Sequence, residues 1–174
     1  MMNTKYYLLR HAEADYSKPS EVKTKGWGLD LAPLSKTGRK QAENITADIQ
    51  KISPEIIITS PTTRTMETTL ILIQHLDMEF RVEFDLHEWI PGFDFEWKNI
   101  DDIHRIEKEF EAYGGEYKGN EVKNWESLSM IRKRVENVLE KYSDYSTVLV
   151  VCHEKVIRAM TGRIGVANCE LIEL

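Results

Sequence analysis

Four short runs of apolar and β-branched residues are spaced along the chain, each close to a polar break. They are 5–10 (KYYLLR), 56–59 (IIIT), 80–84 (FRVEF) and 147–152 (TVLVVC). Runs of this length predict β-strands. The run 147–152 is apolar at nearly every position, which is typical of a parallel strand that is covered by helices on both faces.

Three longer segments repeat apolar residues at helical spacing and predict helices between these strands. The first helix follows Ser35, a good N-cap, and the second is expected to follow Ser60, with Pro61 at its first position. The expected apolar faces are Leu34, Ala42, Ile45, Ile49 and Ile52; Met66, Leu70, Ile73 and Leu76; and Leu128, Ile131, Val135, Val138 and Tyr142. The alternation predicts an α/β fold, a three-layer α/β/α sandwich around a mostly parallel sheet.

The stretch from about 89 to 125 interrupts this alternation and predicts an insertion after the third strand. It contains three of the four tryptophans, many acidic residues and the glycine pair Gly114 and Gly115. Part of it has a helical apolar face, formed by Ile100, Ile103, Ile106 and Phe110. We expect a lid-like, partly helical segment that hinges at the two glycines and determines specificity.

Length and charge narrow the class of protein. A chain of 174 residues with 41% hydrophobic content suits one core, so we expect a single domain over 1–174. The net charge of -6 opposes a general affinity for nucleic acid or for an anionic membrane, because either needs a basic field. Residues 1–5 lack the apolar stretch of a secretory signal, and Cys152 and Cys169 are too few for a disulfide framework. We therefore expect a cytoplasmic protein with no nucleic-acid or membrane partner.

Chemically distinctive side chains follow the predicted strands. They are Arg10 and His11 after the first strand, Ser60 and Arg64 after the second, Glu88 after the third, and His153 after the fourth. The carboxyl ends of parallel strands share one edge of the sheet, and ligands bind there. An arginine suits a phosphoryl group because its planar fork donates two parallel hydrogen bonds and stays charged. The sequence therefore predicts a phosphate site that also holds two imidazoles and one carboxylic acid.

Five segments, in this order, resemble the histidine phosphatase superfamily, also called the phosphoglycerate mutase-like family. They are LLRHAEA (8–14), LSKTGRKQA (34–42), ITSPTTRTMET (58–68), DLHEW (85–89) and VVCHEKVIRAMTG (150–162). The resemblance implies that His11 attacks phosphorus and becomes phosphohistidine. It also implies that Arg10, Arg64 and His153 hold the phosphoryl oxygens while Glu88 protonates the leaving alkoxide, with no cofactor or metal. The expected activity is hydrolysis of a phosphate monoester.

The sequence departs from the family pattern at several positions close to these residues. Ala14 and Ser17 replace the threonine and asparagine that often occur in mutases, so mutase activity is less expected. Glu154 and Lys155 replace the usual glycine pair, which places an acid beside the phosphate site. The string RHAEA also resembles the branch that dephosphorylates phosphohistidine in proteins. The substrate is therefore expected to be a small phosphorylated molecule or a phosphoprotein, and a non-catalytic phospholigand sensor is a further alternative.

Two competing sites need consideration. Cys152 and Arg158 have the spacing of cysteine-dependent phosphatases, but the residues between them are bulky and an acid next to the thiol would raise its pKa. We treat this match as chance. A hydrolytic metal site built from His11, Glu13, His153 and Glu154 is also conceivable, but no recognised ligand spacing supports it. His75, His87 and His104 are interpreted as surface or packing residues.

Overall fold

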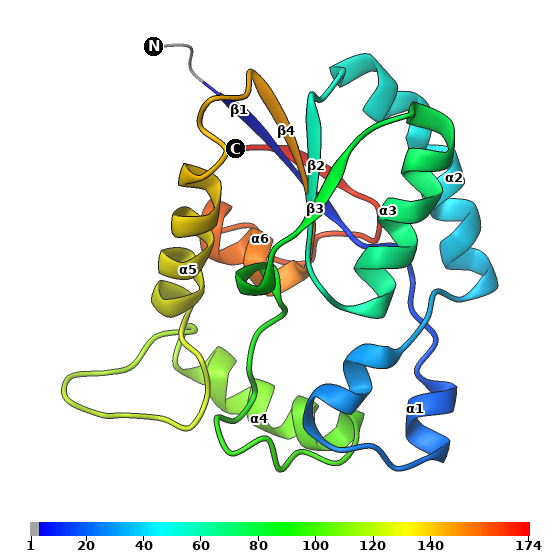
Figure 1. Cartoon of the computed structure of the whole chain (residues 1–174). Coiled ribbons are helices and arrows are strands. Elements are labelled where there is room, and N and C mark those ends of the chain that lie inside the picture. Colours follow the sequence, from blue (N-terminus) through cyan, green and yellow to red (C-terminus); the bar gives the residue numbers. More distant parts are fainter. Residues whose placement is uncertain (1–3) are drawn as a thin grey trace.

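The computed structural model describes residues 4–174, so part of the expectation about residues 1–5 lies outside the described residues. Within residues 4–174, one sheet has the strand order β3-β2-β4-β1-β5 (Figure 1). Its strands are β1 (Lys5–Arg10), β2 (Ile56–Thr59), β3 (Phe80–Val82), β4 (Thr147–Cys152) and β5 (Leu171–Glu173). β1 to β4 are parallel, and β5 runs antiparallel to β1. The predicted mostly parallel sheet is confirmed.

Helices cover both faces of the sheet (Figure 1). α2 (Lys36–Ile52) and α3 (Thr63–Leu76) lie on one face, and α5 (Leu128–Glu140) and α6 (Glu154–Thr161) lie on the other. The sequence patterns did not predict β5, α1 (Ser17–Glu21) or the 3₁₀ helices η1 (Gly26–Leu31) and η2 (Phe84–Leu86). No helix within residues 4–174 is both long and apolar enough to cross a bilayer.

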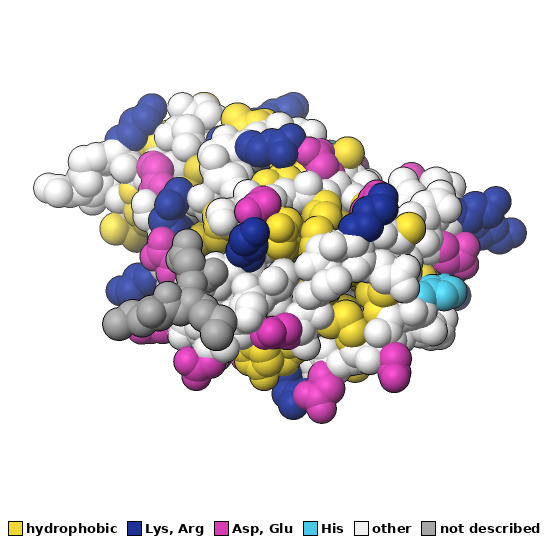
Figure 2. All heavy atoms as spheres, turned by 90° about the horizontal axis from the view of Figure 1, so that it is seen from above, with side chains coloured by type: hydrophobic (Ala, Val, Ile, Leu, Met, Phe, Trp, Pro, Cys, Tyr) yellow, Lys and Arg dark blue, Asp and Glu magenta, His cyan; other side chains and the backbone are white. Residues whose placement is uncertain are grey.

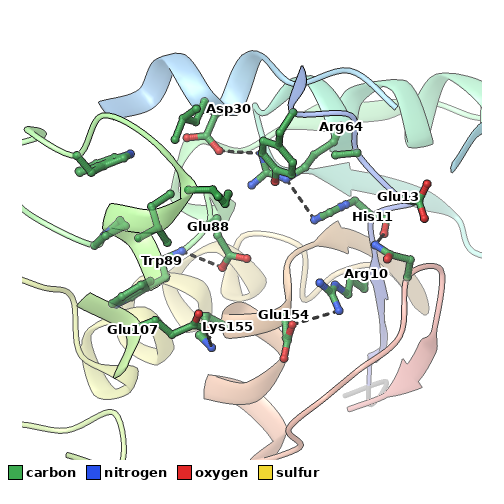
Figure 3. Close-up of a pocket in the computed structure, with 18 residues that line it drawn as sticks. Arg10, His11, Glu13, Asp30, Arg64, Glu88, Trp89, Glu107, Glu154 and Lys155 are labelled. Atoms are coloured by element: carbon green, nitrogen blue, oxygen red, sulfur yellow. Dashed lines mark hydrogen bonds and ion pairs between the residues drawn. The ribbon is translucent and has the colours of Figure 1, made fainter. Parts of the chain in front are cut away.

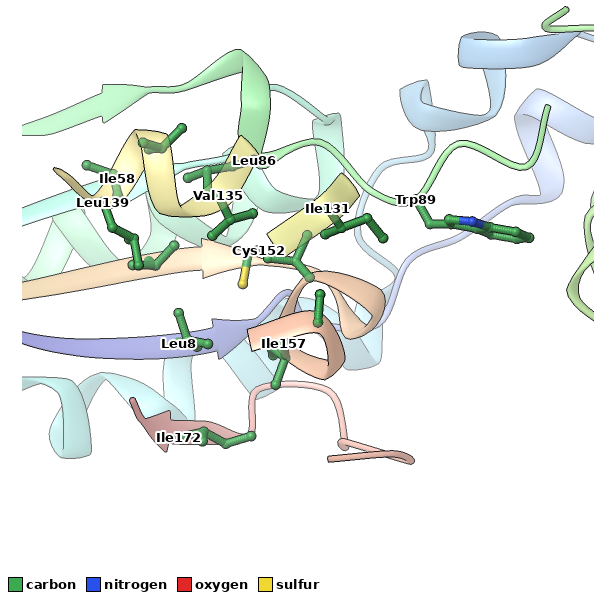
Figure 4. Close-up of a cluster of buried hydrophobic side chains, with 14 of the residues drawn as sticks. Leu8, Ile58, Leu86, Trp89, Ile131, Val135, Leu139, Cys152, Ile157 and Ile172 are labelled. Atoms are coloured by element: carbon green, nitrogen blue, oxygen red, sulfur yellow. The ribbon is translucent and has the colours of Figure 1, made fainter. Parts of the chain in front are cut away.

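Alternating side chains of the sheet feed two layers of core. Leu8, Ile58 and Val150 pack beneath α5 and α6 (Figure 4), whereas Leu9 and Leu149 pack beneath α2 and α3. All five side chains are fully buried. Burial of a side chain of this size contributes roughly 1.5–3 kcal/mol. The two layers therefore fix the register of the strands, and with it the positions of the residues that follow them.

The face of the molecule at the amino ends of the parallel strands carries charged side chains of both signs. Figure 2 views the molecule from above Figure 1, at the edge where the parallel strands begin, and basic and acidic side chains are interspersed on this face. This mixture agrees with the net charge of -6, which is modest for 174 residues. The predicted phosphate site therefore depends on particular basic side chains at the carboxyl ends of the strands.

The second predicted helix differs from the expectation at its start and on its buried face. α3 takes Thr62 as its N-cap, two residues later than predicted. The hydroxyl of Ser60 is engaged elsewhere, because it accepts a hydrogen bond from Nε2 of His153 at 2.7 Å. Leu70, expected in the core, is 43% exposed, while Arg64 and threonines of α3 are buried. The buried face is polar because this helix packs against the site instead of the core along its first turns.

The insertion forms α4 (Ile100–Ala112) and two irregular segments on either side of it. Its tryptophans are packed inside: Trp89, Trp97 and Trp125 are 6%, 7% and 1% exposed. Phe110 of α4 contacts Trp89 and Trp125, with ring centroids 4.8 Å and 5.2 Å apart. These aromatic contacts hold the insertion together, and these three rings also belong to the buried cluster that includes Leu8 and Val150 of the sheet.

The glycine pair that was expected to act as a hinge is held in place. Gly114 and Gly115 have positive φ values of +67° and +78°, which end α4 in the left-handed region. The N–H of Gly115 donates to the carbonyl of Phe110, and its carbonyl accepts from the N–H of Leu128, both at 2.8 Å. A Cβ at Gly115 would lie 2.5 Å from Cδ1 of Leu128, whereas a Cβ at Gly114 would meet nothing within 4 Å. Gly115 is a packing site in this conformation, and a hinge at the glycine pair stays a prediction.

Replacing Gly115 should therefore destabilise the protein more than replacing Gly114. Gly115→Ala combines a left-handed backbone with a clash and should lower the free energy of unfolding by roughly 2–4 kcal/mol. Gly114→Ala, the matched control, faces the backbone cost alone, about 1 kcal/mol. Urea unfolding of both variants measures the difference. Equal losses would show that Gly115 has room to move.

Candidate active site

The sheet register brings three strand ends together. Arg10 at the end of β1 is paired with Cys152 at the end of β4. The N–H of His11 then donates to the carbonyl of Cys152, and the N–H of Ser60 donates to the carbonyl of Val151, both at 3.0 Å. The residues that follow β1, β2 and β4 therefore lie side by side at one edge, as the strand pattern predicted.

His11 is buried at this edge and held in one orientation. Its Nδ1 lies 2.7 Å from the carbonyl oxygen of Ala12, and its Nε2 lies 3.2 Å from Nε of Arg64. The carbonyl can only accept and the guanidinium can only donate, so Nδ1 carries the proton and Nε2 keeps its lone pair. Burial, reinforced by the charge of Arg64, holds the pKa of His11 well below its usual range. The ring is a neutral imidazole whose Nε2 is a candidate nucleophile.

Arg64 connects both histidines. Its guanidinium is 3% exposed, and its Nη1 contacts Oδ1 of Asp30 on η1 at 2.8 Å. Its Nη2 lies 3.3 Å from Nδ1 of His153, and the other ring nitrogen of His153 contacts Ser60. Burial and the neighbouring Arg64 also hold the pKa of His153 well below its usual range. The two imidazole rings meet edge to face, with centroids 5.2 Å apart.

Glu88 faces the same cavity. Its Oε1 accepts a hydrogen bond from the N–H of Trp89 at 2.9 Å, and its Oε2 lies 3.9 Å from Nδ1 of His153. Burial raises the pKa of Glu88, and this effect outweighs the opposing influence of the Trp89 N–H and of Arg64. A carboxyl group with a raised pKa is suited to donate a proton. The nearby acids Glu83 and Asp94 do not line the cavity.

Arg10 completes the cationic part of the site. Its Nη1 lies 3.1 Å from Oε2 of Glu154 and also donates to the carbonyl of Val166. Its Nε is buried and has no hydrogen-bond partner in the described part of the chain. The cavity has a volume of about 310 Å³, and Arg10, His11, Arg64 and Glu88 all line it (Figure 3). Four predicted site residues thus line one cavity, and the fully buried His153 contacts Arg64 and Ser60 next to them.

Three supporting residues were not predicted. Asp30 holds Arg64, and Asn168 donates from Nδ2 to the carbonyl of His11 at 2.9 Å. Thr68 accepts from the N–H of Ala12 at 3.1 Å through its hydroxyl, which in turn donates to the carbonyl of Arg64 at 2.7 Å. Thr68 could have been suspected from the TTRTMETT string, where threonines recur at helical spacing. Asp30 and Asn168 belong to segments with no recognisable pattern.

The competing cysteine site does not form. Cys152 is fully buried in the core, and burial, followed by the charge of Glu88, raises the pKa of its thiol. Arg158 is directed to Glu111 of α4, with Nη1 and Oε1 2.5 Å apart. No group of three or more His, Cys, Asp or Glu side chains within residues 4–174 could hold a metal ion. Independence from metals stays a prediction about activity.

The other three histidines lie outside the cavity. His75 and His104 are exposed. His87 is buried and packs edge to face against Trp27 and Phe84, with centroids 5.0 Å and 5.3 Å apart. All three are surface or packing residues, as predicted.

The fold and this cavity define an α/β protein of the phosphoglycerate mutase-like type. Solved structures that share the fold include mycobacterial glucosyl-3-phosphoglycerate phosphatase, with a TM-score of 0.75, 20% identity, and coverage of 98% of this chain and 89% of that one. Phosphoglycerate mutase from Bacillus anthracis gives a TM-score of 0.71 at 18% identity, with 99% and 88% covered. These likenesses support the fold assignment.

The chain belongs to the histidine phosphatase superfamily (branch 1), whose family model matches residues 6–171. It is 28% identical to an uncharacterized phosphatase, PhoE, of Bacillus subtilis, over 94% of this chain and 79% of that protein. It is 30% identical to a putative phosphoserine phosphatase 2 of Hydrogenobacter thermophilus, over 93% and 80%. These phosphatase relatives support a hydrolase that acts on phosphate esters.

The pairing of Arg10 with Glu154 leads to a testable expectation about anion affinity. Glu154→Gln should strengthen the binding of inorganic phosphate or vanadate about three- to fivefold, because a half-exposed ion pair of up to about 1 kcal/mol no longer competes for Arg10. Glu79→Gln, which removes a surface acid paired with Arg81, is the matched control and should change nothing. Isothermal calorimetry measures both. Weaker binding by Glu154→Gln would instead identify Glu154 as the group that orients Arg10.

Proposed function

We propose that this protein hydrolyses a phosphate monoester through a phosphohistidine intermediate on His11, without a metal ion. The observation that carries the proposal is the tautomer of His11. Its Nε2 carries no proton and accepts a hydrogen bond from Arg64 at the cavity, while Nδ1 donates to a backbone carbonyl. The substrate is a small phosphorylated molecule in the first instance. We place the reaction in the cytoplasm, in keeping with the two free cysteines.

The first step forms the Nε2–P bond and breaks the bond between phosphorus and the ester oxygen. Glu88 donates its proton to the departing alkoxide, and Arg10 and Arg64 hold the phosphoryl oxygens. The phosphorylated imidazole carries positive charge, which the Ala12 carbonyl stabilises by accepting from Nδ1. In the second step water attacks phosphorus and gives a proton to the carboxylate of Glu88, while the Nε2–P bond breaks and its electron pair returns to His11. Phosphate then leaves, and His11 returns to its neutral state.

His153 changes its role when the anion arrives. In the free protein its Nδ1 accepts from Arg64, so it has no proton to offer to a phosphoryl oxygen. A phosphate dianion near both groups would attract the guanidinium and favour the protonated imidazole, because an opposite charge raises the pKa of a histidine. We infer that substrate binding is coupled to the uptake of a proton by His153.

Two alternatives from the sequence are distinguishable from this proposal. A phosphohistidine substrate has a good leaving group and needs no acid, so Glu88 with its raised pKa favours an alkyl ester. Two similar proteins, a putative phosphoserine phosphatase and a glucosyl-3-phosphoglycerate phosphatase, also have names that refer to phosphate esters. A sensor without turnover would bind vanadate but form no phosphoenzyme. These alternatives therefore define the controls of the experiments below.

Loss of the nucleophile should abolish turnover. His11→Ala is expected to lower kcat by at least about 10³-fold and to eliminate an acid-labile, base-stable phosphoenzyme trapped from labelled substrate. His75→Ala, an exposed histidine outside the cavity, is the matched control. The wild-type rate should be unchanged by a chelator. A phosphoenzyme that persists in His11→Ala, or a rate that depends on a divalent ion, would contradict the proposal.

The pH profile should have two limbs with different origins. The neutral form of His11 is required and its pKa is lowered, so activity falls only when the pH drops through that lowered value. The protonated form of Glu88 is required and its pKa is raised, so activity falls as the pH rises through that value. For an alkyl phosphate, Glu88→Gln should remove the part of the alkaline limb of kcat/KM that comes from Glu88, and should leave the part that comes from proton uptake by His153. It should reduce hydrolysis of a phosphoramidate, whose leaving group needs no acid, by less. An unchanged alkaline limb would assign the acid elsewhere.

A further inference from the structure

The cavity has a charged end and an apolar end. His11, Arg10 and Arg64 form the charged end, and Figure 3 shows Trp89 and Glu107 on the side away from them. Glu107 belongs to α4, and positions 100, 103 and 107 of a helix share one face. The apolar lining includes Leu29, Trp97, Ile100 and Ile103. A phosphate ester that occupies the site would therefore place its alcohol part among apolar side chains.

From this arrangement we infer, on the basis of the proposed function, that the substrate is a phosphate monoester of an alcohol with an apolar, ring-sized body and no second anionic group. The apolar lining favours binding of a substrate whose alcohol part is apolar. Each apolar side chain that the ligand covers removes surface from water, at about 25 cal/mol per Å². Side chains of this type cannot replace the water that hydrates a glycerol hydroxyl or a carboxylate.

The charges of the cavity disfavour a substrate with a second anionic group. Every cation that lines it already contacts a carboxylate. The pairs are Arg10 with Glu154 at 3.1 Å, Arg64 with Asp30 at 2.8 Å, and Lys155 with Glu107 at 2.6 Å. The phosphoryl group itself takes up the two arginines. Lys155, the cation that is left, is 8% exposed and has a second carboxylate, Glu111, at 3.2 Å. A second anion on the substrate would therefore meet acids, and like charges reject a ligand efficiently.

The apolar wall is held rigidly, so the cavity size limits the substrate. Lys155 and Arg158 of α6 both bind Glu111 of α4, and both cations lie over the ring of Phe110, at 5.5 Å and 5.3 Å from its centroid. These contacts fix α4 against α6. A volume of about 310 Å³ is at the small end for ligand sites. It has room for a phosphoryl group and a body of roughly one or two rings.

Three synthetic esters with alkoxide leaving groups separate the two halves of the inference. They are 2-phenylethyl phosphate, glycerol 1-phosphate and 2-(4-carboxyphenyl)ethyl phosphate. The kcat/KM for the phenylethyl ester should exceed that for the glycerol ester about tenfold or more, because apolar contacts discriminate on this scale. It should exceed that for the carboxylated ester by a similar factor. Equal or higher values for either polar ester would overturn the inference.

Matched variants of α4 locate the selectivity. Ile100 and Ile103 line the cavity, whereas Ile106 on the same helix packs against the core and does not. The double variant Ile100→Ala/Ile103→Ala should reduce the phenylethyl-to-glycerol ratio of kcat/KM about tenfold. Ile106→Ala should leave the ratio as it is. Glu107→Gln should narrow the gap between the carboxylated and uncarboxylated esters several-fold, because Lys155 gains a free donor. Unchanged ratios in the cavity variants would overturn the inference.

Binding of non-hydrolysable phosphonates separates this inference from the proposed function. Calorimetry should show 2-phenylethylphosphonate binding about tenfold more tightly than its dihydroxypropyl analogue. This preference without turnover or phosphoenzyme would refute the proposed hydrolysis and support the binding preference. Turnover without the preference would refute the inference and leave the hydrolysis standing.

Discussion

The buried guanidinium of Arg64 is the constraint on which the site depends. A cation that is 3% exposed must have partners, and Arg64 finds them in His11, His153 and Asp30. The two histidines can accept from it only while they are neutral, so its position keeps both rings uncharged. Its helix α3 begins late and buries polar side chains because its first turn must deliver this guanidinium to the edge of the sheet. The neutral state of His11 and the shape of α3 are thus consequences of one interaction.

Each cation that lines the cavity is paired with a carboxylate, which explains how an acidic protein can hold several basic side chains at one site. An unpaired buried guanidinium would be costly in the free protein, and Asp30 and Glu154 reduce that cost. The same acids would compete with phosphate for the two arginines. They stabilise the site in the free protein and lower its affinity for an anion. The free Nε of Arg10 and the raised pKa of Glu88 show what is left for a ligand.

The sequence was sufficient for the strands and for the residues directly after them, because both depend on local patterns. Apolar runs predicted β1, β2 and β4, and the parallel register then placed His11 and His153 together. Asp30 and Asn168 could not be predicted, because each acts through a contact with a distant segment and lies in no periodic stretch. The short strand β5 was missed for a similar reason, since its three residues pair with β1 across the whole length of the chain. Gly115 looked flexible in sequence, although in this conformation it packs against Leu128.

The two residues that replace the usual glycine pair after His153 act in opposite directions. Glu154 pairs with Arg10 and offsets part of the positive charge at that end of the cavity. Lys155 pairs with Glu107 and Glu111 and attaches α4 to α6. Glycines could form neither contact, so in this chain the N-terminus of α6 connects Arg10 to α4, which contributes apolar side chains to the cavity. Both contacts start from adjacent backbone positions in the first turn of α6. The insertion is thus attached by ion pairs to the same helix that contacts Arg10, and its action as a lid stays a prediction.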